Sequence, residues 1–115
     1  MHKPTVITTA ALLVAALSIP LSALADDDAK IQARIETWGK TCKNRVAEQF
    51  DAPMSDIQVS VGATEQTSID AGQITLQDLQ EYGLSFNWLV KHGGKEASGY
   101  CNTDGQGNIT EFKQQ

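Results

Sequence analysis

The sequence predicts an α+β domain in which a long N-terminal helix packs on a four-stranded antiparallel sheet, with one disulfide. Three observations support this fold class. Apolar residues first recur at helical spacing, from Ile31 to Phe50. Later segments alternate apolar and polar residues, as half-buried strands do, and turn sequences separate these segments. The two cysteines of the chain, Cys42 and Cys101, lie far apart in the sequence.

The long helix is predicted from a single apolar stripe. The stripe advances in steps of three or four residues and consists of Ile31, Ile35, Trp38, Cys42, Val46 and Phe50. Asp27 or Asp28 is a suitable N-cap, and Pro53 lies just beyond the end of the stripe. We therefore expect a helix of about 22 residues between these positions.

One strand and one loop are predicted in the middle of the chain. Residues 57–63 alternate apolar with polar or small side chains, which indicates a half-buried strand. The next stretch, residues 65–73, is polar and contains a glycine, so we expect a loop. Residues 74–83 fit two structures equally well. They form either a short helix, with Thr75 as its N-cap and Gly83 as its stop, or an edge strand.

A three-stranded meander is predicted for the rest of the chain. Its clearest strand has an apolar side chain at every second position: Leu84, Phe86, Trp88 and Val90. The turn sequence His92-Gly93-Gly94 leads to a returning strand, residues 95–101, and a second turn leads to a last strand, residues 108–112. One helix across such a sheet is similar in general architecture to the cystatin-like and related folds. This likeness rests on no sequence motif and implies no function.

The first 25 residues have the layout of a secretory signal peptide. Lys3 supplies a positive charge, residues 6–17 are mostly apolar, and Ala23-Leu24-Ala25 forms a small-x-small cleavage site. The acidic residues 26–28 follow directly, which argues against a membrane anchor at this point. We therefore predict cleavage after Ala25, a single small domain over residues 26–115, and a periplasmic or secreted location. No membrane insertion is expected after cleavage, because no later apolar run is long enough.

The net charge of the chain indicates which classes of partner it can bind. Its formal net charge is −5 at neutral pH. Nucleic acids and anionic membranes both require a basic surface, so neither is an expected partner. An acidic protein is instead steered towards a basic partner, and we expect a protein partner of that kind.

The two cysteines are predicted to form a structural disulfide. An even number of cysteines in a small exported domain is typical of such bonds, and two allow a single intramolecular pairing, Cys42 with Cys101. The competing interpretation is a reactive thiol. It finds little support, because the sequence lacks a C-x-x-C motif and residues 26–115 contain a single histidine, His92.

Catalytic and cofactor-binding patterns are absent from the sequence. There is no Gly-x-Ser-x-Gly motif, no phosphate-binding glycine loop and no cluster of histidines for zinc. His92 adjoins a Gly-Gly turn, so we expect it to be a solvated loop residue. Asp78 and Glu81 have helical i, i+3 spacing, which is more typical of a solvated helix face than of a catalytic pair. We expect no enzyme activity, no catalytic residues and no cofactor.

Residues 102–110 resemble the start of an EF-hand calcium loop. Asn102, Asp104 and Gln106 would supply the early oxygen ligands, and Gly107 would form the central turn. The position of the closing bidentate glutamate is occupied by Lys113, however, which opposes a cation. A hairpin turn explains the same residues more simply, so no metal site is expected.

The function predicted from these patterns is that of a non-enzymatic binding module, an inhibitor or accessory protein that acts by protein–protein contact. The alternative is an exported protein that binds a small ligand or binds calcium weakly. Trp38, Phe86 and Trp88 lie on stripes that must face each other, so we expect them to fill a core rather than line a cavity. Recognition is then expected on loops at the ends of the sheet. The candidate partner-binding residues are Gln66, Gln73, Lys91 and His92.

Overall fold

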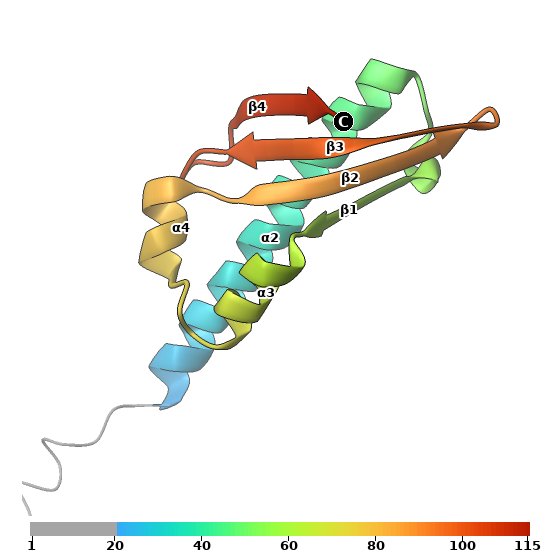
Figure 1. Ribbon diagram of the computed structural model, residues 1–115. Helices are drawn as coiled ribbons and strands as arrows, with labels where there is room; N and C mark the ends of the chain where they lie inside the picture. Colours follow the sequence, from blue (N-terminus) through green and yellow to red (C-terminus); the bar gives the residue numbers. More distant parts are fainter. Residues whose placement is uncertain (1–20) are drawn as a thin grey trace, which may run out of the picture.

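The computed structural model describes residues 21–115, and it confirms the α+β fold class (Figure 1). Helix α2 (Leu21–Phe50) crosses one face of a four-stranded antiparallel sheet in the order β1-β2-β3-β4. The strands are β1 (Ile57–Val61), β2 (Ser85–His92), β3 (Lys95–Thr103) and β4 (Ile109–Gln114). Most of the predicted signal segment lies outside the described residues. In the described part, no helix is long and apolar enough to cross a membrane.

Helix α2 is anchored by the predicted stripe. Ile31, Trp38, Cys42 and Val46 are all buried in the hydrophobic core. The helix begins at Leu21, earlier than the acidic N-caps that we expected. It ends at Phe50, and Asp51 then adopts a positive φ of 49°. A left-handed residue at this position is a common way for a helix to stop.

The predicted loop at residues 65–73 is mostly a helix, so this prediction is wrong. Helix α3 (Ala63–Asp70) follows β1 directly, and a short 3-10 helix, η1 (Met54–Asp56), precedes that strand. A local polar bond supports α3, because the side-chain amide of Gln66 donates to the carboxylate of Asp70 one turn later. Ile69 is its single buried residue. A helix with one apolar anchor has no periodic stripe, which explains why the pattern did not reveal it.

Residues 74–83 were predicted to form either a short helix or an edge strand, and the structure shows the helix. Helix α4 (Leu76–Tyr82) begins with a capping box, in which the Thr75 hydroxyl accepts from the amide of Asp78 and the Asp78 carboxylate accepts from the amide of Thr75. Leu79 is buried, and Gly83 ends the helix with φ of 75°. A side chain at Gly83 would also overlap the carbonyl oxygen of Thr103, so a glycine is required there.

The core lies between α2 and the sheet and is centred on Trp88. The Trp88 ring lies between Phe50 of α2 and Phe112 of β4, with centroid distances of 5.4 and 5.3 Å. Gly99 makes this packing possible, because a Cβ atom there would lie 2.6 Å from the Trp88 ring. Trp38, Phe86 and Trp88 are all buried, which confirms that these aromatic residues fill a core.

The predicted disulfide is present. Cys42 of α2 and Cys101 of β3 are bonded, both are completely buried, and their Cα atoms lie 6.0 Å apart. The bond ties the middle of the helix to the third strand, as expected. It therefore fixes α2 on the sheet close to the aromatic core.

A candidate binding cleft at the hairpin end of the sheet

Part of strand β3 has a partner on one side only. Its residues 95–102 pair with β2, but β4 reaches no further than Gln114, which lies opposite Gly99. One more bond follows, from the amide of Gln115 to the carbonyl of Ser98. On the side away from β2, the backbone of residues 95–97 therefore has no neighbouring strand in the described chain. Unpaired strand edges of this kind can pair with another chain.

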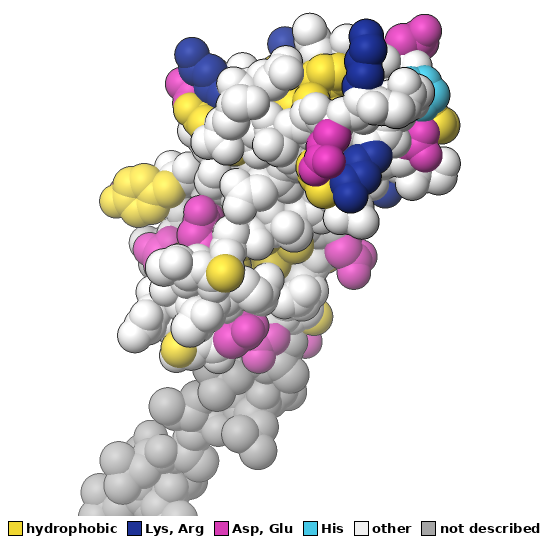
Figure 2. Space-filling view, turned by 45° about the vertical axis from the view of Figure 1, so that its right-hand side comes forward, with side chains coloured by type: hydrophobic (Ala, Val, Ile, Leu, Met, Phe, Trp, Pro, Cys, Tyr) yellow, Lys and Arg dark blue, Asp and Glu magenta, His cyan; other side chains and the backbone are white. Residues whose placement is uncertain are grey.

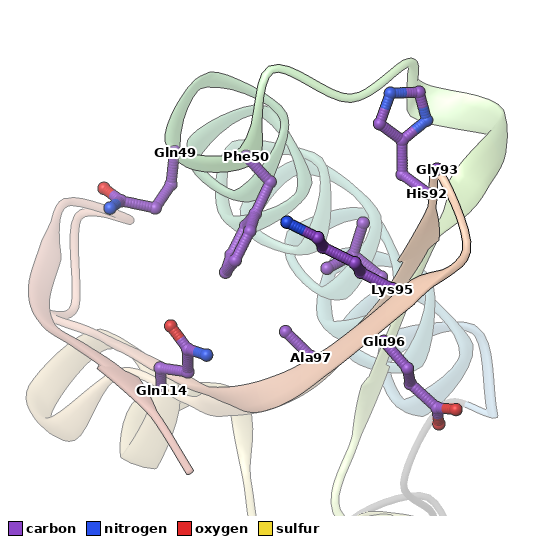
Figure 3. Close-up of a pocket in the computed structure, with 9 residues that line it drawn as sticks. Gln49, Phe50, His92, Gly93, Lys95, Glu96, Ala97 and Gln114 are labelled. Atoms are coloured by element: carbon purple, nitrogen blue, oxygen red, sulfur yellow. The ribbon is translucent and has the colours of Figure 1, made fainter.

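A cleft of about 580 Å³ lies beside this unpaired edge. We call it the hairpin cleft, because it lies between the end of α2 and the β2–β3 hairpin (Figure 3). Phe50, Val90 and Ala97 give it an apolar floor, and Gln49 and Gln114 lie at its rim. The cleft exists because α2 stops at Phe50 and Ala97 has a small side chain, so neither fills the space above the sheet.

Lys95 is the charged side chain that reaches into the cleft. Figure 3 shows its ammonium group extending towards Phe50, whereas the side chain of the neighbouring Glu96 points away. This difference follows from the strand, because successive side chains lie on opposite faces of a sheet. Lys95 has no ion-pair partner among the described side chains.

His92 is held at the edge of the cleft by a carboxylate. Its Nδ1 atom lies 2.8 Å from Oδ2 of Asp56, and both side chains are partly exposed. The contact joins the end of β2 to η1. His92 is exposed to solvent, as expected, but it is the last residue of β2 rather than a loop residue, so that part of the prediction is wrong. The Gly-Gly turn, with positive φ at both glycines, begins one residue later.

Basic side chains gather at this end of the molecule. In the face shown in Figure 2, lysine and arginine side chains lie in the half that contains the histidine. Acidic side chains dominate the other half in that view. His92 is the only histidine of the described residues, so it marks the hairpin end. The hairpin end therefore carries most of the basic side chains in this view, together with acidic ones such as Glu96.

The four candidate partner-binding residues do not form one surface. Gln66 lies on α3, where its amide donates to Asp70, and Gln73 follows the same helix. Lys91 and His92 lie at the other end of β2, because Val61, just before α3, pairs with Phe86 near the start of that strand. Lys91 and His92 also fall on opposite faces of the sheet. Only His92 lines the hairpin cleft.

The other cleft residues were missed by the sequence analysis. Phe50 was recognised only as part of the helical stripe, and Lys95 only as the start of a strand. The cleft depends on where β4 ends relative to β3, and alternation within one strand does not reveal how far its neighbour extends. The Gly-Gly turn beside Lys95 was the one local signal that an exposed hairpin end was present.

The calcium-like segment forms a turn closed by Asp104. One oxygen of its carboxylate accepts from the amides of Gln106 and Asn108, at 2.9 and 3.0 Å. Gly107 packs against the Trp38 indole and Gly105 against the carbonyl of Gln80, so the turn is part of the packed structure. No group of three or more potential metal ligands lies together in the described residues.

The bonds to Asp104 predict a pH dependence. The amide of Asn108, and then that of Gln106, lowers the pKa of the Asp104 carboxyl below its ordinary value. A lowered pKa in the folded protein stabilises the fold above the unfolded value of about 4, and this contribution is lost as the pH falls through the folded value. Asp104→Asn keeps the shape but removes the charge. Urea unfolding between pH 6 and pH 2 should show a weaker loss of stability on acidification in the variant. Equal pH dependence in both proteins would contradict this assignment.

We also predict that calcium binds no more tightly than about millimolar, the weak end of the range for extracellular calcium modules. The Asp104 oxygens already accept hydrogen bonds within the turn, and Lys113 replaces the closing glutamate. Calorimetric titration of the folded protein with calcium tests this expectation. A micromolar site that Asp104→Ala abolishes would show that the turn is a metal site.

No family model, curated protein or solved structure matches this chain.

Proposed function

We propose that this protein is an exported, non-enzymatic binding module, of the inhibitor or accessory type, that contacts a partner protein at the hairpin cleft. The observation that carries this proposal is the unpaired edge of β3 beside an apolar floor. Free backbone donors and acceptors beside partly buried apolar side chains, here Phe50 and Ala97, suit a polypeptide. The net charge of −5 favours a partner that is basic overall.

Binding of a small ligand is the second candidate function. The cleft volume of about 580 Å³ falls in the range of small-molecule sites and supports this alternative. The unpaired backbone of β3 favours the protein partner, because a small ligand leaves most of such an edge unused. A cross-linker in the cleft distinguishes the two functions, because it captures a protein in the first case and a small molecule in the second.

Export to the periplasm or the medium is supported by the buried disulfide and by the features of residues 1–25. Cleavage after Ala25 removes the first residues of α2, which begins at Leu21, and leaves its buried stripe intact. We expect Asp26 as the mature N-terminus. The intact mass of the protein recovered outside the cytoplasm measures this directly, and a retained leader would contradict it.

Photo-cross-linking at the cleft rim tests the proposed function. A photoreactive amino acid replaces Gln49, which lines the cleft, or its neighbour Glu48, which is equally exposed but is not a lining residue. Both variants keep Lys95 and the apolar floor. After irradiation in the producing organism, we expect a discrete protein adduct from position 49 that excess wild-type domain suppresses, and none from position 48. Equal adducts at both positions, or none at position 49, would contradict the proposal.

A further inference from the structure

We infer that the partner contributes an extended segment that lies antiparallel beside residues 95–97 of β3 and carries an apolar-x-acidic sequence. This inference rests on the proposed function and names the chemistry of the bound segment. It follows from three observations: the free edge of β3, the alternation of side chains along that strand, and the charges that face the cleft.

The free edge fixes the direction of the segment. Strand β4 runs antiparallel to β3 and ends opposite Gly99, and the amide of Gln115 bonds to the carbonyl of Ser98. A partner segment that extends β4 in the same direction therefore begins opposite Ala97 and ends opposite Lys95. Main-chain hydrogen bonds then give affinity, and pockets for alternate side chains give specificity.

The alternation of side chains fixes the spacing. Ala97 and Lys95 are two residues apart and lie on the face of β3 that turns towards the cleft. On the added segment, the residue opposite Ala97 and the one opposite Lys95 are also two apart and face the same way. The first of them contacts the apolar floor of Phe50, Val90 and Ala97. The second lies beside the Lys95 ammonium group.

The charges that face the cleft fix the second residue as acidic. Helix α2 contributes the neutral Gln49, and β4 contributes the neutral Gln114. His92 of β2 is engaged by Asp56, and the Glu96 side chain points away from the cleft. We therefore expect an aspartate or glutamate at the position of the segment that lies beside the Lys95 ammonium group. Because the segment runs antiparallel to β3, its sequence reads apolar, any residue, acidic.

Strands β1 and β4 are the outermost strands of the sheet and also have an unpaired edge in the described chain, and a groove with different surroundings lies beside β1. The groove between β1 and α2 has a volume of about 430 Å³ and is lined by Lys40, Lys43 and Glu36, which carry charges of both signs. Because these charges have both signs, the groove beside β1 favours neither an acidic nor a basic segment, whereas Lys95 in the hairpin cleft favours an acidic one. Binding at β1 is an outcome that the experiment below can detect.

Titration with synthetic peptides, followed by amide NMR, tests this inference. The probe is acetyl-Thr-Thr-Leu-Thr-Glu-Thr-amide, and its matched control has Lys in place of Glu. We expect the Glu peptide to shift the amide resonances of residues 95–97 and Gln114. At low salt it should bind roughly fivefold more tightly than the Lys peptide. Lys95→Glu should reverse this preference. Glu96→Lys, on the other face of the same strand, should preserve it.

The outcomes separate this inference from the proposed function. Absence of shifts at residues 95–97, shifts centred on β1, or an unchanged preference in Lys95→Glu would overturn the apolar-x-acidic segment. If the cross-link at position 49 still captures a protein in that case, the cleft is a protein-binding site of different chemistry. If the peptides bind as expected but position 49 captures no protein, the proposed function fails instead. Circular dichroism of both β3 variants verifies that they are folded.

Discussion

Replacement of both Cys42 and Cys101 with alanine is expected to lower the free energy of unfolding by about 4 kcal/mol. The bond closes a loop with a sequence separation of 59 residues, which restricts the unfolded chain strongly. A domain of this size has a small core, so the loss is a large fraction of its total stability. Urea unfolding of the oxidised wild type and the double variant measures the difference. A loss below about 1 kcal/mol would show that the disulfide contributes little to stability.

Trp88→Ala is expected to cost about 3–5 kcal/mol, the range for large aromatic residues in a core. Trp88 is only 2 % exposed and packs between Phe50 and Phe112. Its removal leaves a cavity between α2 and β4. Phe50 also forms part of the cleft floor, so the variant should lose partner binding as well.

Trp88→Phe is the matched control for this variant. The indole nitrogen has no hydrogen-bond partner in the described structure, so the smaller ring removes contact area and no hydrogen bond. We expect a clearly smaller loss of stability than for alanine in chemical unfolding. If both substitutions destabilise the protein equally, the indole nitrogen of Trp88 makes a hydrogen bond in solution, contrary to this expectation.

The architecture was predictable because its main elements have strong, regular patterns. The stripe from Ile31 to Val46 and the alternation of Phe86, Trp88 and Val90 are buried in the structure as expected. These positions must face each other, since each is apolar on one side only. The disulfide was predictable for a different reason, because two cysteines allow a single pairing.

Helix α3 was not predictable from periodicity. It consists mainly of polar residues, and Ile69 is its only buried side chain. Its hydrogen bonds, such as that from Thr67 to the carbonyl of Ala63, are local and leave no apolar pattern in the sequence. The structure of residues 74–83 was undecided for a related reason, until the capping box of Thr75 and Asp78 was visible.

The hairpin cleft depends on relations between elements rather than on any one of them. Lys95 and Phe50 lie far apart in the sequence, and they meet because α2 stops over the hairpin end. The free edge arises because β4 ends opposite Gly99, whereas β3 continues back to Lys95. Sequence patterns predicted the four strands and the turn at Gly93-Gly94, but they did not predict the relative lengths of β3 and β4.

In our proposal, the hairpin end of the sheet is the surface that contacts a partner protein. Amide hydrogen exchange tests this proposal. It is measured on the domain alone and on its complex with the purified partner that the cross-link at position 49 captures. We predict slower exchange at residues 95–97 on binding and unchanged exchange along β1, Ile57–Val61. Protection at β1 or α3, with residues 95–97 unchanged, would contradict the claim and place the contact elsewhere on the domain.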